Sequence, residues 1–307
     1  MSGLMLLDTP SLYFRAFFGV PESVTAPDGT PVNAVRGLVD MIARLVQDRR
    51  PERLVCCMDA DWRPAFRVAA LPSYKAHRVA PDGGDQTPDA LEAQLPLIDA
   101  VLKAFGLAIA GVAGYEADDV IGTLAVRGAR HGPVDVVTGD RDLFQLVDER
   151  GPVQVLYTAR GIRNLQVMGE KEVADKYGIP GRGYADYATL RGDPSDGLPG
   201  VPGIGDKTAA ALVTRFGSLE GILEALEAGT QEGFPPGARR RMEAAHEYLA
   251  AARTVVRVVT DIDDPALREL DDRLPSTPRD PEALVALADE WALSGPVNRL
   301  LNALAAP

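Results

Sequence analysis

Three short, largely apolar segments of this chain each run directly into an aspartate. They are residues 4–7 before Asp8, 54–58 before Asp59 and 134–139 before Asp140. Segments of this length between turn residues are typical of buried strands. Stretches of helical periodicity separate them, so the pattern predicts a parallel α/β sheet with helices on both faces. Because ligands bind beyond the carboxyl ends of such strands, we expect the three carboxylates to meet at one edge of the sheet.

The amino-acid composition excludes several classes of protein. Of the 307 residues, 46% are hydrophobic and 25% charged, as in an ordinary globular protein. The net charge of -12 argues against binding a polyanion through bulk charge, although a local basic patch or bound cations could still attract nucleic acid. Cys56 and Cys57 are neighbours that point to opposite faces of a strand, so no disulfide is expected. The longest apolar stretch, 105–115, is far shorter than the about 20 residues that span a membrane, which favours a cytoplasmic protein.

Six further acidic residues stand at turns or helix starts. They are Glu116, Asp118, Asp119, Asp142, Asp193 and Asp196. Singly, any of them could be a helix cap or a partner of a helix dipole, which is worth about 0.3–1 kcal/mol. Together with the strand-end aspartates they favour a metal site, because clustered carboxylates repel one another unless cations neutralise them. An all-oxygen set suits Mg²⁺ or Mn²⁺, and two such ions about 3.5–4 Å apart can activate water for phosphodiester hydrolysis.

A basic excursion separates the second strand from the helix that begins near Pro88. Residues 62–80 contain no acidic residue, and a flexible loop, 81–87, follows them. The whole excursion is too long for an ordinary connection, so a functional insertion is expected. Its four basic residues are Arg63, Arg67, Lys75 and Arg78. Tyr74 is expected to stack on a base while its basic neighbours pair with phosphate; the alternative is a solvated basic loop.

A glycine-rich turn opens a helix in the second half of the chain. Residues 198–210 have the helix-hairpin-helix pattern, in which Gly203 and Gly205 let the backbone approach a phosphate and Lys207 and Thr208 stand in the first helical turn. The alternative is a tight helix–helix turn. Helical patterns at 170–177, 184–190, 207–216, 219–226 and 239–252 surround it. We therefore divide the chain into a core (1–175), an all-helical unit (176–260) and an acidic tail with one helix (261–307).

Three of these motifs together resemble the bacterial 5′–3′ exonuclease family. The resemblance rests on residues 114–119, 138–143 and 192–205 and extends from Asp8 to about Phe216. The family includes the N-terminal nuclease domain of DNA polymerase I and the flap endonucleases. It implies a PIN-like nuclease core with a helical arch, here about 62–87, and a helix-three-turn-helix (SAM-like) unit. Because no polymerase domain follows, the chain is expected to be a free-standing member.

The resemblance also implies roles for individual residues. Lys75 and Arg78 would contact the scissile phosphate, with Tyr74 and Arg67 assisting. Two or more Mg²⁺ or Mn²⁺ ions would bind the acidic set, and a potassium ion would lie at the hairpin. The implied metal ligands are Asp8, Asp59, Glu116, Asp118, Asp119, Asp140, Asp142, Asp193 and Asp196. Three positions depart from the usual pattern without removing a ligand: Pro10 and His77, where Ser and Gly are usual, and Gly197, where Asn is usual.

The expected function is that of a structure-specific 5′ nuclease. It would degrade duplex DNA 5′–3′ and cut 5′ flaps by a two-metal-ion mechanism, in primer removal and DNA repair. Its partners would be flapped, nicked or gapped DNA, an RNA primer–DNA hybrid, and a DNA polymerase in trans; it would act as a monomer in the cytoplasm, at the nucleoid. Two alternatives are a junction-binding protein that cleaves poorly and a PIN-type ribonuclease. The complete acidic set weighs against the first, and the arch and hairpin weigh against the second.

Overall fold

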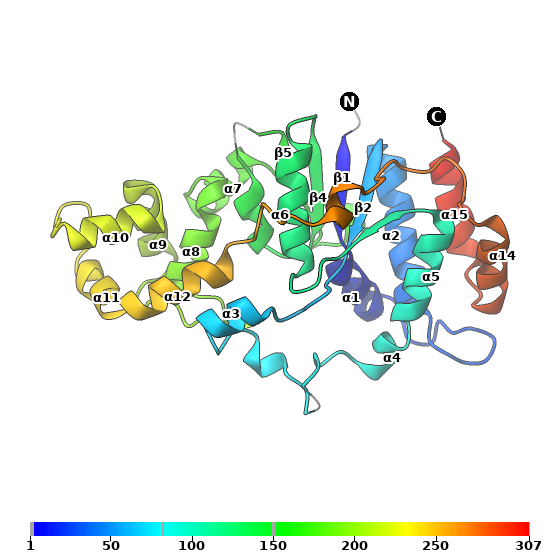
Figure 1. The fold of residues 1–307 in the computed structure, drawn as a ribbon, viewed down its shortest axis with the longest axis horizontal. Coiled ribbons are helices and arrows are strands. Elements are labelled where there is room, and N and C mark those ends of the chain that lie inside the picture. The colour runs from blue at the N-terminus through cyan, green and yellow to red at the C-terminus, as the bar shows by residue number, and fades with distance from the viewer. Residues whose placement is uncertain (1–2, 82, 149–150, 307) are drawn as a thin grey trace.

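The computed structural model describes residues 3–81, 83–148 and 151–306, and its centre is a six-stranded sheet (Figure 1). The strand order is β3-β2-β1-β4-β5-β6, in which all neighbouring pairs are parallel except β5 and β6. The strands are β1 (Leu4–Asp8), β2 (Arg53–Cys57), β3 (Ala108–Ala110), β4 (Val134–Thr138), β5 (Val153–Tyr157) and β6 (Gln166–Met168). The predicted α/β class is confirmed, while β3 and the antiparallel β6 were not foreseen.

Both faces of the sheet are buried, because successive side chains of each strand enter different cores. Cys57 belongs to the core that contains α6 and the helical unit, and Cys56 to the core that contains α2 and α5; both are free thiols. This two-sided burial explains why the strands read as continuous apolar runs. The helices around the sheet are α1 (Thr9–Gly19), α2 (Asn33–Arg49), α5 (Leu95–Phe105), α6 (Ala117–Gly128) and α7 (Glu170–Tyr177).

The strand register brings the predicted acidic residues to one edge. Leu7 of β1 lies opposite Cys56 of β2 on one side and Val137 of β4 on the other. The three strands therefore end level with one another, and Asp8, Asp59 and Asp140 follow at their carboxyl ends. This is the edge at which α/β proteins bind ligands.

A cluster of five helices follows α7 and lies to one side of the sheet (Figure 1). They are α8 (Tyr184–Arg191), α9 (Asp206–Phe216), α10 (Leu219–Glu227), α11 (Ala238–Ala244) and α12 (His246–Val256). The single helix expected at 239–252 is therefore two helices. Ala245, with φ −101° and ψ 13°, interrupts the helical path between them.

The tail differs from the expected single helix. It forms α13 (Pro265–Arg268), α14 (Pro281–Glu290) and α15 (Ser294–Ala305), of which α15 packs on α2 and α14 on α5. Asp264 and Asp280 cap α13 and α14 by accepting hydrogen bonds from backbone amides, each followed by a proline in the first turn. Each Asp-Pro pair thus marks a helix start.

The helical segments described in the basic excursion between β2 and α5 are all short. They are α3 (Ala65–Ala70), the 3₁₀ turn η1 (Ala76–Arg78) and α4 (Asp89–Glu92), and we call residues 62–87 the arch. Residue 82 of the arch lies outside the described residues. Across the described parts of the chain, no helix combines the length and apolar character that a membrane crossing requires.

Candidate active site

A cleft of about 440 Å³ opens at the carboxyl edge of the sheet. Six of the nine predicted metal ligands line it, together with one carboxylate from the arch loop that the sequence analysis missed, Asp85. The seven lining carboxylates are Asp8, Asp59, Asp85, Glu116, Asp118, Asp140 and Asp193. Three cationic side chains also line it: Lys75, Arg78 and Arg141. We call this hollow the carboxylate cleft.

Asp8 is held at the junction of β1 and α1. Its carboxylate caps α1 by accepting from the amide of Ser11 at 3.2 Å, and it accepts from the Thr138 hydroxyl at 2.5 Å. Burial raises the pKa of Asp8 to about 7, and the nearby Asp59 and Asp140 add to this rise. Pro10 stands in the first turn of α1, where a backbone amide has no partner within the helix, so this departure from the family pattern does not disturb the site.

The charge of Asp140 acts on several of the neighbouring carboxylates. Burial raises the pKa of Asp118 and of Asp142 well above the usual range, and the charge of Asp140 raises both further. Asp142 does not line the cleft, and its Oδ1 atom is a buried acceptor without a hydrogen-bond partner. Mutually repelling carboxylates with an unsatisfied oxygen fit a site for hard divalent cations.

Glu116, however, is already bound by the arch. Its carboxylate forms ion pairs with Lys75 and Arg67 and accepts a hydrogen bond from the Tyr74 hydroxyl at 2.8 Å. No group of three carboxylate, histidine or cysteine side chains among the described residues is arranged to enclose an ion. Arch cations therefore compensate part of the acidic set in this conformation.

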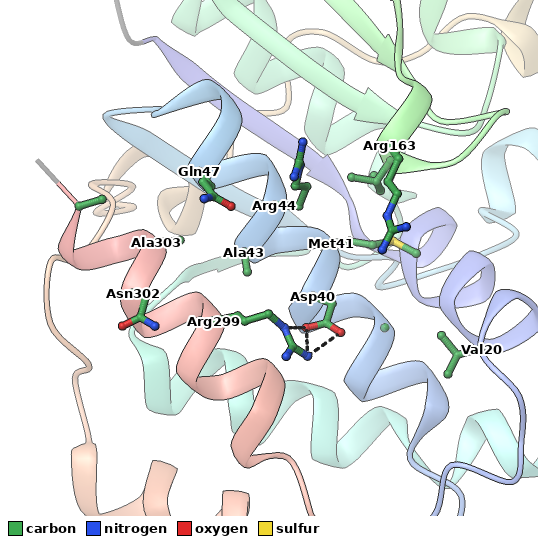
Figure 2. Close-up of a pocket in the computed structure, with 13 residues that line it drawn as sticks. Val20, Asp40, Met41, Ala43, Arg44, Gln47, Arg163, Arg299, Asn302 and Ala303 are labelled. Atoms are coloured by element: carbon green, nitrogen blue, oxygen red, sulfur yellow. Dashed lines mark hydrogen bonds and ion pairs between the residues drawn. The ribbon is translucent and has the colours of Figure 1, made fainter.

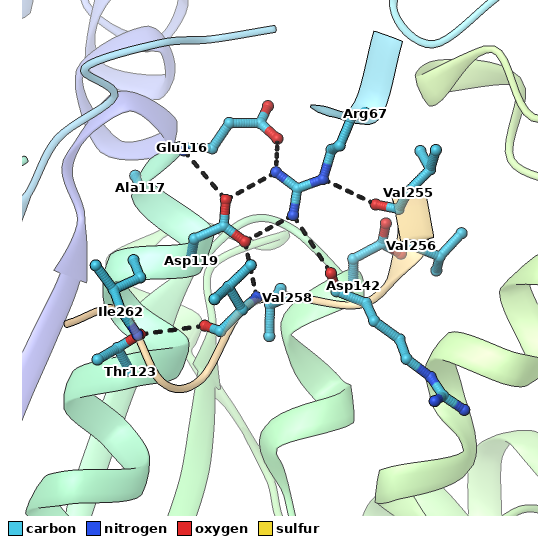
Figure 3. A network of polar contacts seen from close by, with 12 residues as sticks. Arg67, Glu116, Ala117, Asp119, Thr123, Asp142, Val255, Val256, Val258 and Ile262 are labelled. Carbon is cyan, nitrogen blue, oxygen red and sulfur yellow. Dashed lines mark hydrogen bonds and ion pairs between the residues drawn. The ribbon is translucent and has the colours of Figure 1, made fainter. Parts of the chain in front are cut away.

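The structure places Asp119 away from the cleft. Its side chain is fully buried and pairs with Arg67 at 2.6 Å (Figure 3). It also accepts hydrogen bonds from the backbone amides of Glu116, at 3.2 Å, and Val259, at 2.8 Å. These contacts cap α6 and tie it to the segment after α12, so Asp119 acts here as a structural partner of Arg67.

Tyr74 and Arg67 also differ from the expectation of exposed DNA contacts. Tyr74 is 3% exposed and Arg67 is 2% exposed. Arg67 bridges the arch to the helical unit as well, because it donates to the carbonyl of Val255 at 3.0 Å (Figure 3). Arg67 lies on α3, which packs against α12, and the Tyr74 hydroxyl points to the buried Glu116 carboxylate. Tyr74 cannot stack on a base in this arrangement.

The last two predicted ligands lie in a loop on which the arch docks. Asp193 caps the 3₁₀ turn η5 (Pro194–Asp196) and lines the cleft, whereas Asp196 lies beneath the arch. Arg78 reaches Asp196 at 3.5 Å, and the amide of Lys75 donates to the carbonyl of Asp196 at 3.0 Å. Burial raises the pKa of Asp196 to about 6. Lys75 itself adopts a left-handed conformation with φ 47°, which is uncommon for a residue with a side chain.

Gly197 explains one departure from the family pattern. Its φ is +73°, and a Cβ atom there would lie 2.2 Å from the carbonyl oxygen of Ser73 in the arch. Asparagine tolerates positive φ, so the close approach of the arch, and not the backbone angle, requires glycine here.

Replacing Gly197 by asparagine should therefore loosen the arch. We expect a loss of about 1–3 kcal/mol in the free energy of unfolding, typical of overpacking, and faster proteolytic cleavage within residues 62–87. Gly161→Asn is a matched control, since Gly161 has φ +82° and a Cβ atom there would meet nothing within 4 Å. Equal effects of the two substitutions would show that the arch does not need the space at Gly197.

The predicted hairpin lies at the start of α9. Gly203 has φ +80° and its carbonyl accepts from the Arg241 guanidinium at 3.3 Å, whereas a Cβ at Gly205 would meet nothing within 4 Å. Lys207 is exposed and Thr208 half-buried in the first turn. Because no packing inside the chain requires glycine at 205, the open space there is available to a ligand.

Another hollow lies elsewhere in the described part of the molecule. It has a volume of about 850 Å³, lies between α2 and α15, and shares no lining residue with the carboxylate cleft (Figure 2). Its single carboxylate, Asp40, is bound by Arg299 at 2.7 Å. It offers no set of metal donors, so the chemistry belongs to the smaller carboxylate cleft.

The molecule combines a mostly parallel sheet, an acidic cleft at its carboxyl edge, an arch and a helical hairpin unit. Together these features define the architecture of a metal-dependent nuclease. Residues 3–178 match the family described as 5′-3′ exonuclease, N-terminal resolvase-like domain, and residues 179–279 match 5′-3′ exonuclease, C-terminal SAM fold. The chain belongs to the 5′-3′ exonuclease family and is a 5′ nuclease, as the sequence predicted.

Relatives and solved structures agree with this assignment. A 5′-3′ exonuclease of Streptomyces coelicolor is 58% identical over 98% of this chain and 100% of its own length. A DNA polymerase I of Mycobacterium tuberculosis is 37% identical over 99% of this chain but only 32% of its own length. A bacteriophage T5 flap endonuclease in complex with DNA and metal ions has the same fold, with a TM-score of 0.63, 18% identity and 99% coverage of both chains. Flap endonuclease-1 from Methanococcus jannaschii has a TM-score of 0.59, 16% identity and 99% and 93% coverage.

Proposed function

We propose that the chain is a structure-specific 5′ nuclease that degrades DNA 5′–3′ and cuts 5′ flaps with the help of divalent metal ions. The observation that carries this proposal is the carboxylate cleft, in which seven acidic side chains meet beneath the arch cations Lys75 and Arg78. A hairpin suited to a DNA backbone lies in the same molecule. Bound DNA and metal in the T5 structure support the same proposal.

Magnesium or manganese ions fit this donor set. The metal-donor side chains that line the cleft are oxygen donors, chiefly carboxylates, with no histidine or cysteine among the described lining residues. Asp142, whose Oδ1 atom has no hydrogen-bond partner within the described parts of the chain, interacts electrostatically with Asp140 of the cleft. Two or more such ions would be held chiefly by Asp8, Asp118 and Asp140, and when bound they would supply an activated water and stabilise the leaving oxygen. A potassium ion at the hairpin stays a prediction; the carbonyl of Gly203 there accepts from Arg241 and keeps a second lone pair.

The chain's own residues would bind and orient the substrate. Lys75 and Arg78 line the cleft and can donate to the oxygens of a phosphodiester, which stabilises the negative charge that builds up on it. Both now contact acidic partners, so substrate would have to draw them away from Glu116 and Asp196. The amides at the start of α9 can hold a second phosphate.

The decisive experiment is cleavage of a labelled 5′-flap duplex with Mg²⁺, with the product ends mapped. We expect products with a 5′-phosphate and a 3′-hydroxyl, and no cleavage in EDTA. Tight binding of the flap without cleavage would favour the junction-binding alternative. Faster cleavage of an RNA flap than of a DNA flap would favour the ribonuclease alternative.

Lys75→Ala should slow the reaction more than it weakens binding. Removing one donor that stabilises transition-state charge typically costs about 10²–10³-fold in kcat. Single-turnover rates and flap affinities measured separately would show this split. Lys103→Ala is the matched control, because Lys103 is an exposed lysine on α5 that pairs with Asp99 of the same helix. If affinity alone falls in Lys75→Ala, the lysine is a phosphate anchor without a part in the chemistry.

The cellular role follows from the same proposal. Removal of RNA primers and DNA repair would present 5′ flaps, nicks, gaps and primer–DNA hybrids, with a DNA polymerase supplied in trans. The chain would act as a monomer in the cytoplasm, at the nucleoid.

A further inference from the structure

A second hollow lies beside the carboxylate cleft and carries charge of the opposite sign. It has a volume of about 820 Å³ and is formed by the end of β5, by α7 and α8, and by the first turn of α9. Five lining residues are cationic and one is acidic: Arg141, Arg160, Lys176, Arg191, Lys207 and Asp206. In a chain with a net charge of -12, this local excess of positive charge suits an anionic ligand. We call this hollow the basic pocket.

The basic pocket connects the carboxylate cleft to the hairpin. Arg141 and Tyr157 line both the basic pocket and the cleft. At its other end, Asp206 and Lys207 are the first residues of α9, the helix that the hairpin opens. A strand that extends from the cleft to the hairpin therefore passes this pocket.

The cationic side chains of the basic pocket differ in how far contacts inside the chain compensate their charge. Arg191 lies 3.6 Å from Asp193 and 3.9 Å from Asp206, so its charge is partly compensated. Lys176 lies over two tyrosine rings, at 5.6 and 5.2 Å from their centroids. Arg141 forms no ion pair with any carboxylate in the described parts of the chain, although it is half-buried at the border of the cleft. Its guanidinium is thus available to a ligand.

We propose that the basic pocket binds backbone phosphates of the cleaved DNA strand between the cleft and the hairpin. In this proposal, which rests on the nuclease function proposed above, Arg141 is the positioning residue that selects which phosphodiester enters the cleft. Arg141 follows Asp140 directly in the sequence, so a phosphate bound to it is a near neighbour of the scissile one. A guanidinium binds phosphate oxygens in a fixed two-pronged geometry. The tyrosine rings of the pocket provide walls for a sugar or a base.

The test combines cut-site mapping with the salt dependence of binding, using a labelled 5′-flap duplex. In Arg141→Ala we expect about fivefold weaker binding, a log–log salt slope smaller by about 0.9, and cuts spread over neighbouring phosphodiesters. Arg141→Lys should restore most of the affinity but less of the cut-site accuracy, because an ammonium group lacks the planar fork. Arg163→Ala is the matched control, since it removes the same charge from the hollow in Figure 2, which shares no lining residue with the cleft.

A second variant tests the proposal even if Arg141→Ala does not fold. Arg160 is exposed, so Arg160→Ala should fold normally and also lower the salt slope by about 0.9. If both variants cut at the wild-type position with an unchanged salt slope, the assignment of the basic pocket is wrong while the nuclease function stands. If the wild-type chain neither binds nor cuts the flap, the proposed function itself fails.

Discussion

Asp140→Asn is expected to reduce cleavage of a 5′-flap duplex on the order of a thousandfold, equivalent to about 4 kcal/mol of transition-state stabilisation. Asp140 is a source of the charge that raises the pKa of Asp8, of Asp118 and of Asp142. Losing this charge weakens the attraction of the cleft for divalent cations. The asparagine keeps the side-chain oxygen that accepts from the amide of Asp142 at 2.8 Å, so the turn should remain intact.

The same substitution should make the metal-free protein more stable. Removing one charge from a cluster of like charges relieves repulsion, so the melting temperature in EDTA should rise while the gain on adding Mg²⁺ should shrink. Asp135→Asn is a suitable control, because Asp135 lies on β4 outside the cleft. A mutant that turns over like the wild type, or that melts lower in EDTA, would contradict the role given to Asp140.

The strand-end part of the site was predictable because it depends on local pattern and topology alone. Apolar runs that end in aspartate determine both the parallel strands and the edge at which Asp8, Asp59 and Asp140 meet. No such rule gives the direction of a side chain in an irregular insertion. Tyr74 was expected to face DNA and is instead buried, because its hydroxyl donates to Glu116, a residue 42 positions later in the chain.

Long-range contacts account for the other differences. Asp85 could not be placed in the cleft from the sequence, since a loop of turn residues carries no signal of where it folds back. Asp119 has a ligand's position in the motif, but its actual partner, Arg67, lies 52 positions earlier in the chain. Only one tail helix was predicted, whereas the structure has two that pack on the core, α14 on α5 and α15 on α2, and a contact of this kind has no local sequence signal.

The docked arch places its cations against carboxylates that are predicted metal ligands. Glu116 and Asp196, two predicted ligands, are paired with arch cations. These cations therefore neutralise part of the negative charge that metal ions would otherwise neutralise. Metal and phosphate together could replace those partners, since phosphate attracts the cations and metal attracts the carboxylates. Gly197 fits this exchange, because it allows the arch to approach the loop closely.

Arg67→Ala is expected to give the largest loss of stability of any single change in the arch, about 3–5 kcal/mol, seen as a fall of about 6–10 °C in the melting temperature. Arg67 is 2% exposed and pairs with two carboxylates that are themselves buried, Glu116 and Asp119. Without the guanidinium, both charges remain in a poorly solvated interior. The carbonyl of Val255 also loses its donor, so the arch separates from the helical unit.

Two comparisons distinguish this mechanism from a general effect of removing an arginine. Arg44→Ala removes an exposed pair with Asp48 and should cost at most about 1 kcal/mol. Adding Asp119→Asn to Arg67→Ala should recover part of the loss, because it removes one of the stranded charges. If the double variant were less stable than Arg67→Ala by the full cost of Asp119→Asn alone, the two side chains would be uncoupled, and Arg67 would stabilise the arch through packing and its backbone contacts instead.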